Sequence, residues 1–199
     1  MALVRPCTVG DGIRRLSADE ARGALSAYET AAPDKKRIKF VPASGAATRM
    51  FKHLTVAYQG LQGGASFSRP EDRPSKPQLF EFMDNCHKFA FYGELKAALS
   101  RSGLDVGALL KHHDFLPILA HLIEEKHLNY AALPKGLIKF HAYGPEVRTA
   151  FEEHLAEGHG YAGSRDGGCA LHFTVTPQHQ ERISRFLNTV LRTYEKRCN

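Results

Sequence analysis

The stretch that most constrains the fold is residues 37–50, which read R-I-K-F-V-P-A-S-G-A-A-T-R-M. Ile38, Phe40 and Val41 predict a short strand, and the apolar spacing after the small residues predicts a helix over residues 46–58. A turn between a strand and a helix points unpaired backbone N–H groups and the positive end of the helix dipole at one place. Small residues also let a ligand approach the backbone closely. The stretch therefore predicts an anion-binding turn.

Helical and extended patterns alternate along much of the remaining chain. A capping box at Ser17 begins a first helix that we expect to end near Ala31. Later patterns predict an extended run at residues 138–141, a helix at 144–157, a strand at 169–176 and a last helix from Pro177. Such alternation is typical of an α/β domain with a mostly parallel sheet.

The middle of the chain has a different character. Residues 59–77 are rich in glycine and proline and poor in apolar side chains, which predicts a mobile surface loop. Residues 78–130 carry several short helical patterns, and we interpret them as a helical insertion. The expected organisation is one domain over residues 1–199 that carries this loop and this insertion.

Charge and hydropathy narrow the class of partner and the location. The net charge of +6 and the isoelectric point of about 9.2 favour anionic partners. No run approaches the roughly 18 apolar residues that a membrane helix needs, and Arg5, Pro6 and Asp11 interrupt any signal-peptide core. The four cysteines lie far apart in the sequence, without the spacing of a zinc site. We therefore expect a cytoplasmic chain with no membrane partner and free thiols.

A second motif lies at residues 133–137, L-P-K-G-L, where Lys135 directly follows a rigid proline. A lysine held in this way can neutralise a phosphate near a helix N-terminus. The first motif is weak when taken alone, because it lacks the Gly-Lys-Ser/Thr of a Walker loop and the three glycines of the dinucleotide fingerprint. An ordinary tight turn accounts for it equally well. The two motifs together favour a phosphate-binding loop.

At these motifs the chain resembles the nucleotide-diphospho-sugar transferase superfamily, the sugar-phosphate nucleotidyltransferases. Further strings, K-F-A-F-Y, R-T-A-F-E-E-H-L and L-H-F-T-V, look like an uncharacterised bacterial family, number 4301 among the domains of unknown function. This resemblance extends from about Arg5 to the C-terminus. It implies a Rossmann-like sheet of the nucleotidyltransferase type and a nucleotide or sugar phosphate as ligand. The chain is similar to the N-terminal half of a longer family architecture.

The resemblance also implies roles for individual residues. Arg49 and Lys135 would neutralise phosphate charge in the transition state of a phosphoryl-type transfer. Lys139 and His141 are the candidate substrate-binding residues. Residues that would hold the base and phosphates are Ser44, Gly45, Ala46, Ala47 and Thr48.

An active enzyme of this type would use Mg²⁺. We assign no metal ligand, because the superfamily keeps its metal-binding carboxylates in the half that this chain does not match. Ser44 and Ala47 also stand where the superfamily's motif has glycines. The implied partner, besides the ligand, is a missing C-terminal half or a partner chain.

Three function classes stay open at this point. The first is a sugar-phosphate nucleotidyltransferase, and the second is a non-catalytic nucleotide-binding fragment or regulatory domain. The third is a basic nucleic-acid-binding protein, for which Arg182, Arg185 and Arg192 on the last helix would contact the phosphate backbone. We do not favour the third class, because no aromatic stacking platform accompanies these arginines.

Overall fold

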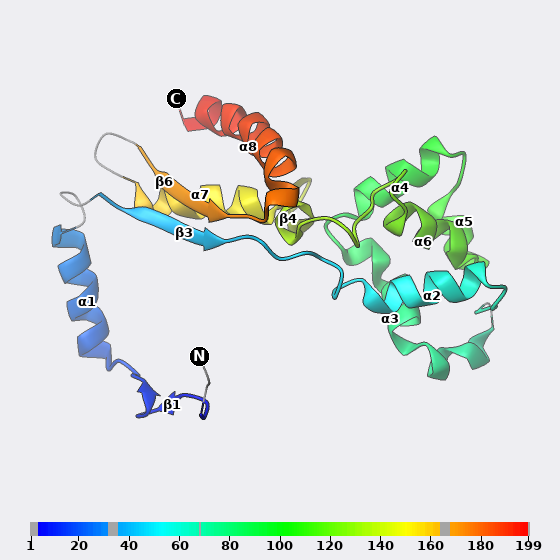
Figure 1. The fold of residues 1–199 in the computed structure, drawn as a ribbon, viewed down its shortest axis with the longest axis horizontal. Coiled ribbons are helices and arrows are strands. Elements are labelled where there is room, and N and C mark those ends of the chain that lie inside the picture. The colour runs from blue at the N-terminus through cyan, green and yellow to red at the C-terminus, as the bar shows by residue number, and fades with distance from the viewer. Residues whose placement is uncertain (1–3, 32–35, 68, 164–167, 199) are drawn as a thin grey trace. The chain divides into compact units, whose positions relative to one another are not determined.

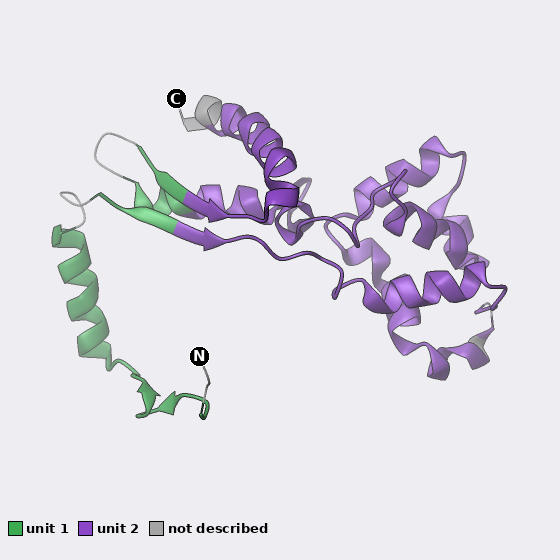
Figure 2. Cartoon of the chain, viewed as in Figure 1, with its two compact units in different colours: residues 1–39, 158–171 green, residues 40–157, 172–199 purple. Residues whose placement is uncertain are grey.

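The computed structural model describes residues 4–31, 36–67, 69–163 and 168–198. The chain divides into two compact units, residues 1–39 with 158–171 and residues 40–157 with 172–199 (Figure 2). The boundary passes through strand β3 (Ile38–Pro42), helix α7 (Ala150–Ala162) and strand β6 (Ala170–Thr174). The predicted α/β class is confirmed.

The first unit contains two short strands, β1 (Thr8–Val9) and β2 (Gly12–Ile13), and helix α1 (Ala18–Ala31). The predicted capping box at the start of α1 is present. The Ser17 N–H donates to Glu20 Oε2 at 2.8 Å, and the Glu20 N–H donates to Ser17 Oγ at 3.2 Å. These two bonds satisfy N–H groups that the first turn leaves without a helical partner, so α1 begins where the sequence predicts.

The helical part of the second unit consists of α2 (Lys52–Gln62), α3 (Pro77–Asn85), α4 (Tyr92–Arg101), α5 (Val106–Lys111) and α6 (Phe115–Ile123) (Figure 1). Two 3₁₀ helices, Pro70–Ser75 and Cys86–Lys88, lie between these helices in the sequence. The helices enclose one apolar cluster, and each buried leucine or isoleucine in it contributes about 1.5–3 kcal/mol. Fully buried members are Leu95, Leu99, Ile118, Leu119 and Leu122.

The rest of the second unit combines strands with two longer helices. Strands β4 (Lys139–Tyr143) and β5 (Glu146–Thr149) form an antiparallel hairpin, and β3 pairs with β6. Helix α8 (Pro177–Cys198) begins at the predicted Pro177. Phe151 of α7 packs against Phe173 of β6 and Phe186 of α8, with ring centroids 5.0 and 6.3 Å apart. Aromatic rings therefore join these two helices to the sheet.

The sheets are smaller than the resemblance implies. Among the described residues each sheet has two strands, with β1 parallel to β2 and β4 antiparallel to β5. The Rossmann-like sheet therefore stays a prediction. None of the described helices combines the length and the apolar character that crossing a membrane requires.

The predicted helix at residues 46–58 starts too early, because α2 begins at Lys52. Ala46 instead forms a β-bridge with Pro134, and the Ala47 N–H donates to the Leu133 carbonyl at 3.0 Å. The Met50 N–H donates to the Ala47 carbonyl at 2.8 Å and closes a tight turn. Since the backbone at Ala46 and Ala47 is committed to this long-range bridge, it does not enter a helix.

The predicted helix over residues 144–157 is also wrong in its first part. Gly144 has a φ of 62°, in the left-handed region that glycine tolerates, and makes the turn between β4 and β5. Helix α7 starts only at Ala150, after a capping box in which the Thr149 N–H donates to Glu152 Oε2 at 2.7 Å. Pro145 is compatible with a helix start or with a turn, and the local pattern does not distinguish them.

Tyr130 links the helical cluster to strand β4 through a carboxylate. Its buried ring contacts the rings of Phe51 and Phe91, and its hydroxyl donates to Glu94. Glu94 also forms an ion pair with Lys139, whose Nζ lies 2.8 Å from the Glu94 carboxylate. Burial, followed by the contact with the Glu94 carboxylate, raises the pKa of Tyr130. The hydroxyl therefore stays protonated and keeps donating.

Two histidine rings stack beside this cluster. His121 and His127 have ring centroids 3.8 Å apart, and His121 is buried. His121 Nδ1 lies 2.8 Å from the Pro117 carbonyl, which can only accept, so His121 Nε2 accepts from the Ser102 hydroxyl. Burial, then the charge of His121, lowers the pKa of His127. Protonating His127 places a charge against the buried His121 ring.

We expect the Tyr130→Phe variant to lose about 1.5–3 kcal/mol of unfolding free energy, because a buried hydrogen bond to a charged acceptor disappears while the ring packing remains. Urea denaturation at neutral pH measures the loss. Tyr92→Phe is the matched control, since no described residue accepts a hydrogen bond from the Tyr92 hydroxyl. Equal losses in the two variants would contradict the role of the Glu94 contact.

Stability should fall as the pH drops below about 6.5, the ordinary pKa of histidine. The reason is that the lowered pKa of His127 lets the unfolded chain bind more protons than the folded one over this window. The surrounding charges are Arg101 and Lys126, which oppose protonation, and Glu124, which favours it. Urea midpoints at pH 8 and pH 5.5 should differ more for the wild type than for His127→Gln. The same pH dependence in both would exclude His127 as the cause.

Candidate functional site

The structure brings the two sequence motifs into direct contact. Ala46 and Pro134 form an antiparallel β-bridge. The Lys135 N–H donates to the Gly45 carbonyl at 3.0 Å, and the Ala47 N–H donates to the Leu133 carbonyl at the same distance. Two segments that are far apart in the sequence therefore pair with each other. The sequence positions of the two motifs did not predict this pairing.

Lys135 opens a 3₁₀ turn, Lys135–Leu137, directly after the fully buried Pro134. Its side chain lies along the backbone of Gly45, where a Cβ would be 3.8 Å from Lys135 Cδ and 3.9 Å from Nζ. Lys135 is half-buried, and its ammonium group makes no hydrogen bond or ion pair with any described residue. The ammonium group thus has donors to offer a ligand.

A cavity of about 260 Å³ opens beside Lys135. The end of β3, the turn after it, the 3₁₀ turn and the start of α7 form its walls. Val41, Pro42 and Phe151 supply apolar surface, whereas Lys135 and His154 are the titratable side chains in the lining. A mostly apolar concave surface with a few polar groups is the usual character of a small-molecule site.

A glycine is required at position 136, which belongs to the cavity lining. A Cβ on Gly136 would lie 2.5 Å from Cε2 and 2.8 Å from Cδ2 of Phe151, whose side chain is fully buried. A buried aromatic ring between Phe173 and Phe186 has no room to give way. The glycine in the L-P-K-G-L motif therefore serves packing, because it lets the 3₁₀ turn rest on the Phe151 ring.

His154 is the cavity residue that the sequence analysis missed. It lies one turn into α7, with Nδ1 3.3 Å from Glu157 Oε2 and its ring 6.3 Å from the ring of Phe173. Residues three and four positions apart share a helix face, so Ala150 and His154 line the same side. The string R-T-A-F-E-E-H-L, which supported the family resemblance, contains His154 and was the available signal.

Most of the first motif lies outside the cavity lining, which includes only Gly45 of the five predicted phosphate-binding residues. Ala47 is fully buried in the helical core, and its N–H already donates to Leu133. The other members, Ser44, Ala46 and Thr48, are exposed, as is the proposed catalytic residue Arg49. Because α2 starts at Lys52, the unpaired amides of its first turn also lie beyond the small-residue segment.

The two candidate substrate-binding residues likewise lie outside this lining. Lys139 is in β4, and its ammonium group is paired with Glu94. His141 pairs with Arg148 across the β4–β5 hairpin. Of the residues that the resemblance implicates, the cavity lining therefore contains Gly45 and Lys135.

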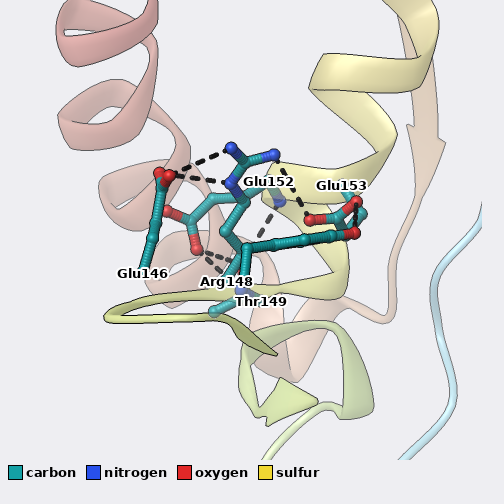
Figure 3. Close-up of polar contacts among 6 residues, drawn as sticks. Glu146, Arg148, Thr149, Glu152 and Glu153 are labelled. Atoms are coloured by element: carbon teal, nitrogen blue, oxygen red, sulfur yellow. Dashed lines mark hydrogen bonds and ion pairs between the residues drawn. The ribbon is translucent and has the colours of Figure 1, made fainter. Parts of the chain in front are cut away.

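A separate charged cluster holds the hairpin against α7 (Figure 3). The Arg148 guanidinium donates to both carboxylate oxygens of Glu146 at 3.2 Å and lies 3.6 Å from Glu153. The guanidinium carbon of Arg148, Cζ, lies 4.9 Å from the centre of the Tyr143 ring. The Tyr143 hydroxyl donates to Glu153 at 2.9 Å. Hydrogen bonding to Glu146 raises the pKa of Arg148. Arg148 is thus held by two protein carboxylates, and the cluster has a structural role.

The residues that the structure describes do not form a Mg²⁺ site. Mg²⁺ prefers carboxylate and water oxygens, and the cavity lining contains no aspartate or glutamate. Elsewhere in the described ranges, no three His, Cys, Asp or Glu side chains come together in a way that would hold a metal ion. We therefore derive no chemical step through a metal.

Comparison with known proteins identifies a family without an assigned activity. A family model described as a domain of unknown function, DUF4301, matches residues 1–199. No curated protein matches the chain, and no solved structure does. Because the family model covers the whole sequence, from the strand–turn motif to the last helix, the chain belongs to the DUF4301 family.

Proposed function

We propose that this chain binds a phosphorylated small molecule, a nucleotide or a phosphorylated sugar, in the cavity beside Lys135. The observation that carries the proposal is the ammonium group of the half-buried Lys135 side chain, which lies in the cavity lining and has no anionic partner among the described residues. A phosphate oxygen would accept a charge-assisted hydrogen bond from this ammonium group.

Two further features support this proposal. Gly45 has no side chain, so a ligand can approach the backbone beside the Lys135 ammonium group. The bridge between Gly45 and Lys135 holds both groups in a defined position, which reduces the entropy lost on binding. The resemblance to nucleotide-diphospho-sugar transferases, which rests on the same two motifs, also favours a phosphorylated ligand.

Nucleotidyl transfer in a Rossmann-like fold is the finer form of the proposal. In that reaction a sugar-phosphate oxygen forms a bond to the α-phosphorus of a nucleoside triphosphate, and the bond to the leaving pyrophosphate breaks. Such a transfer needs several positive charges around the phosphates. Lys135 supplies one, whereas Arg49 is exposed and outside the cavity lining. Binding without transfer is therefore the function that the geometry favours.

Replacing Lys135 with methionine should weaken binding of inorganic phosphate or AMP at least tenfold, because a charge-assisted hydrogen bond contributes about 1.5–3 kcal/mol. Isothermal titration calorimetry at constant ionic strength measures the affinity. Lys96→Met is the matched control, since Lys96 is exposed on α4 and lies outside the cavity lining. Arg49→Gln should have much less effect than Lys135→Met. Absence of binding in the wild type, or equal affinity in Lys135→Met, would refute the proposal.

The Gly136→Ala variant should unfold at lower urea concentration, with a loss of about 1–3 kcal/mol from overpacking against Phe151. It should also bind phosphate more weakly, because the 3₁₀ turn that carries Lys135 must shift. Gly93→Ala is the control, because a Cβ on Gly93 meets no atom within 4 Å. Wild-type stability and affinity in Gly136→Ala would show that the close contact is not rigid.

A further inference from the structure

We infer that the ligand is a compact phosphomonoester, with a body about as large as one sugar ring, bound between Lys135 and His154. The inference rests on the proposed function and makes it more specific, because it selects one ligand class and excludes a nucleoside triphosphate. It also assigns a binding role to His154. Three observations carry it, namely the size of the cavity, the charge of its lining and the hydrogen bonding of His154.

The first observation is the cavity volume of about 260 Å³. Pockets for drug-sized ligands begin at about 300 Å³, and a nucleoside triphosphate has a base, a ribose and three phosphates to accommodate. Gly136 and the fully buried Phe151 both belong to the lining and already pack closely against each other, so neither can give way to a larger ligand. The cavity therefore suits one phosphate and one small ring.

The second observation is the number of positive charges in the lining. Lys135 is the permanent cation there. A phosphomonoester carries about −1.5 to −2 charges near neutral pH, which is far less charge to neutralise than a triphosphate carries. A triphosphate is bound by several cations or by Mg²⁺, and this lining offers neither an arginine nor a carboxylate.

The third observation is the orientation of the His154 ring. Its Nδ1 faces Glu157 Oε2 at 3.3 Å, and because a carboxylate accepts, Nδ1 carries a proton. Nε2 is then the nitrogen left for a ligand, and in this tautomer it accepts a hydrogen bond. The groups around the ring are Glu157 on the same helix and Phe173 on β6, and Lys135 belongs to the same cavity lining. A hydroxyl group on the ligand body can therefore donate to His154 Nε2 while the phosphate accepts from Lys135.

Calorimetric titrations of the whole chain with four probes test the ligand class. The probes are inorganic phosphate, glucose 6-phosphate, ribose 5-phosphate and ATP, the last with and without Mg²⁺. We expect both sugar phosphates to bind at least tenfold more tightly than ATP. If no probe binds, the proposed function itself fails. If ATP binds more tightly than the sugar phosphates and Lys135→Met abolishes that binding, the proposed function stands and the inference on ligand class is overturned.

A second measurement tests His154 directly. Calorimetric titrations of a sugar phosphate against the His154→Phe variant measure the contribution of His154 to affinity. This replacement keeps an aromatic ring but removes the ring nitrogens, and it should weaken affinity about three- to tenfold, while circular dichroism confirms folding. His159→Phe is the matched control, because His159 is exposed on the same helix and lies outside the cavity lining. Unchanged affinity in His154→Phe would overturn the role of His154.

Discussion

The arrangement of the candidate site depends on the short antiparallel bridge between residues 45–47 and residues 133–135. Two backbone hydrogen bonds, from Ala47 to Leu133 and from Lys135 to Gly45, close a loop that contains the whole helical cluster. Each such bond contributes only about 1 kcal/mol, but the buried methyl group of Ala47 and the buried Pro134 ring add apolar packing on both sides. The bridge places the Lys135 side chain along Gly45 and brings the end of β3 to the start of α7.

The same bridge explains why the site differs from a glycine-rich phosphate loop. In such loops, free backbone amides at a helix N-terminus surround the phosphate. Here the Ala47 and Lys135 amides are used by the bridge, and α2 begins farther along at Lys52. Recognition of an anion therefore falls to side chains, with Lys135 as the permanent charge. A site built from few charges favours a small and moderately charged ligand, which is the basis of our inference on ligand class.

The polar clusters outside the cavity divide the charged residues into those that hold the fold and those that remain for a ligand. Arg148 is held by Glu146 and Glu153, and Lys139 is held by Glu94. A lysine or arginine that is paired with a protein carboxylate would have to break that ion pair in order to bind a ligand. The free energy lost with the ion pair offsets the free energy gained from the ligand. Lys135 has no such competing contact among the described residues, which distinguishes it from basic residues of similar burial.

Local signals in the sequence sufficed for features that depend on neighbouring residues. The Ser17 capping box and the proline at the start of α8 gave correct helix starts, because capping involves atoms within one helical turn. The start of α2 was predicted wrongly, because the segment before it pairs with Leu133 and Pro134, which are distant in the sequence. The turn at Gly144 was predicted wrongly as a helix start, because the local pattern fits both and only the pairing with strand β4 decides between them. His154 joins Lys135 only through packing of α7 on the sheet. Composition and local pattern thus established the α/β class and pointed to residues 44–49, 135, 139 and 141. Long-range backbone pairing and ring packing decided that Gly45 and Lys135 alone of these line the cavity, and they set its size and its second polar residue.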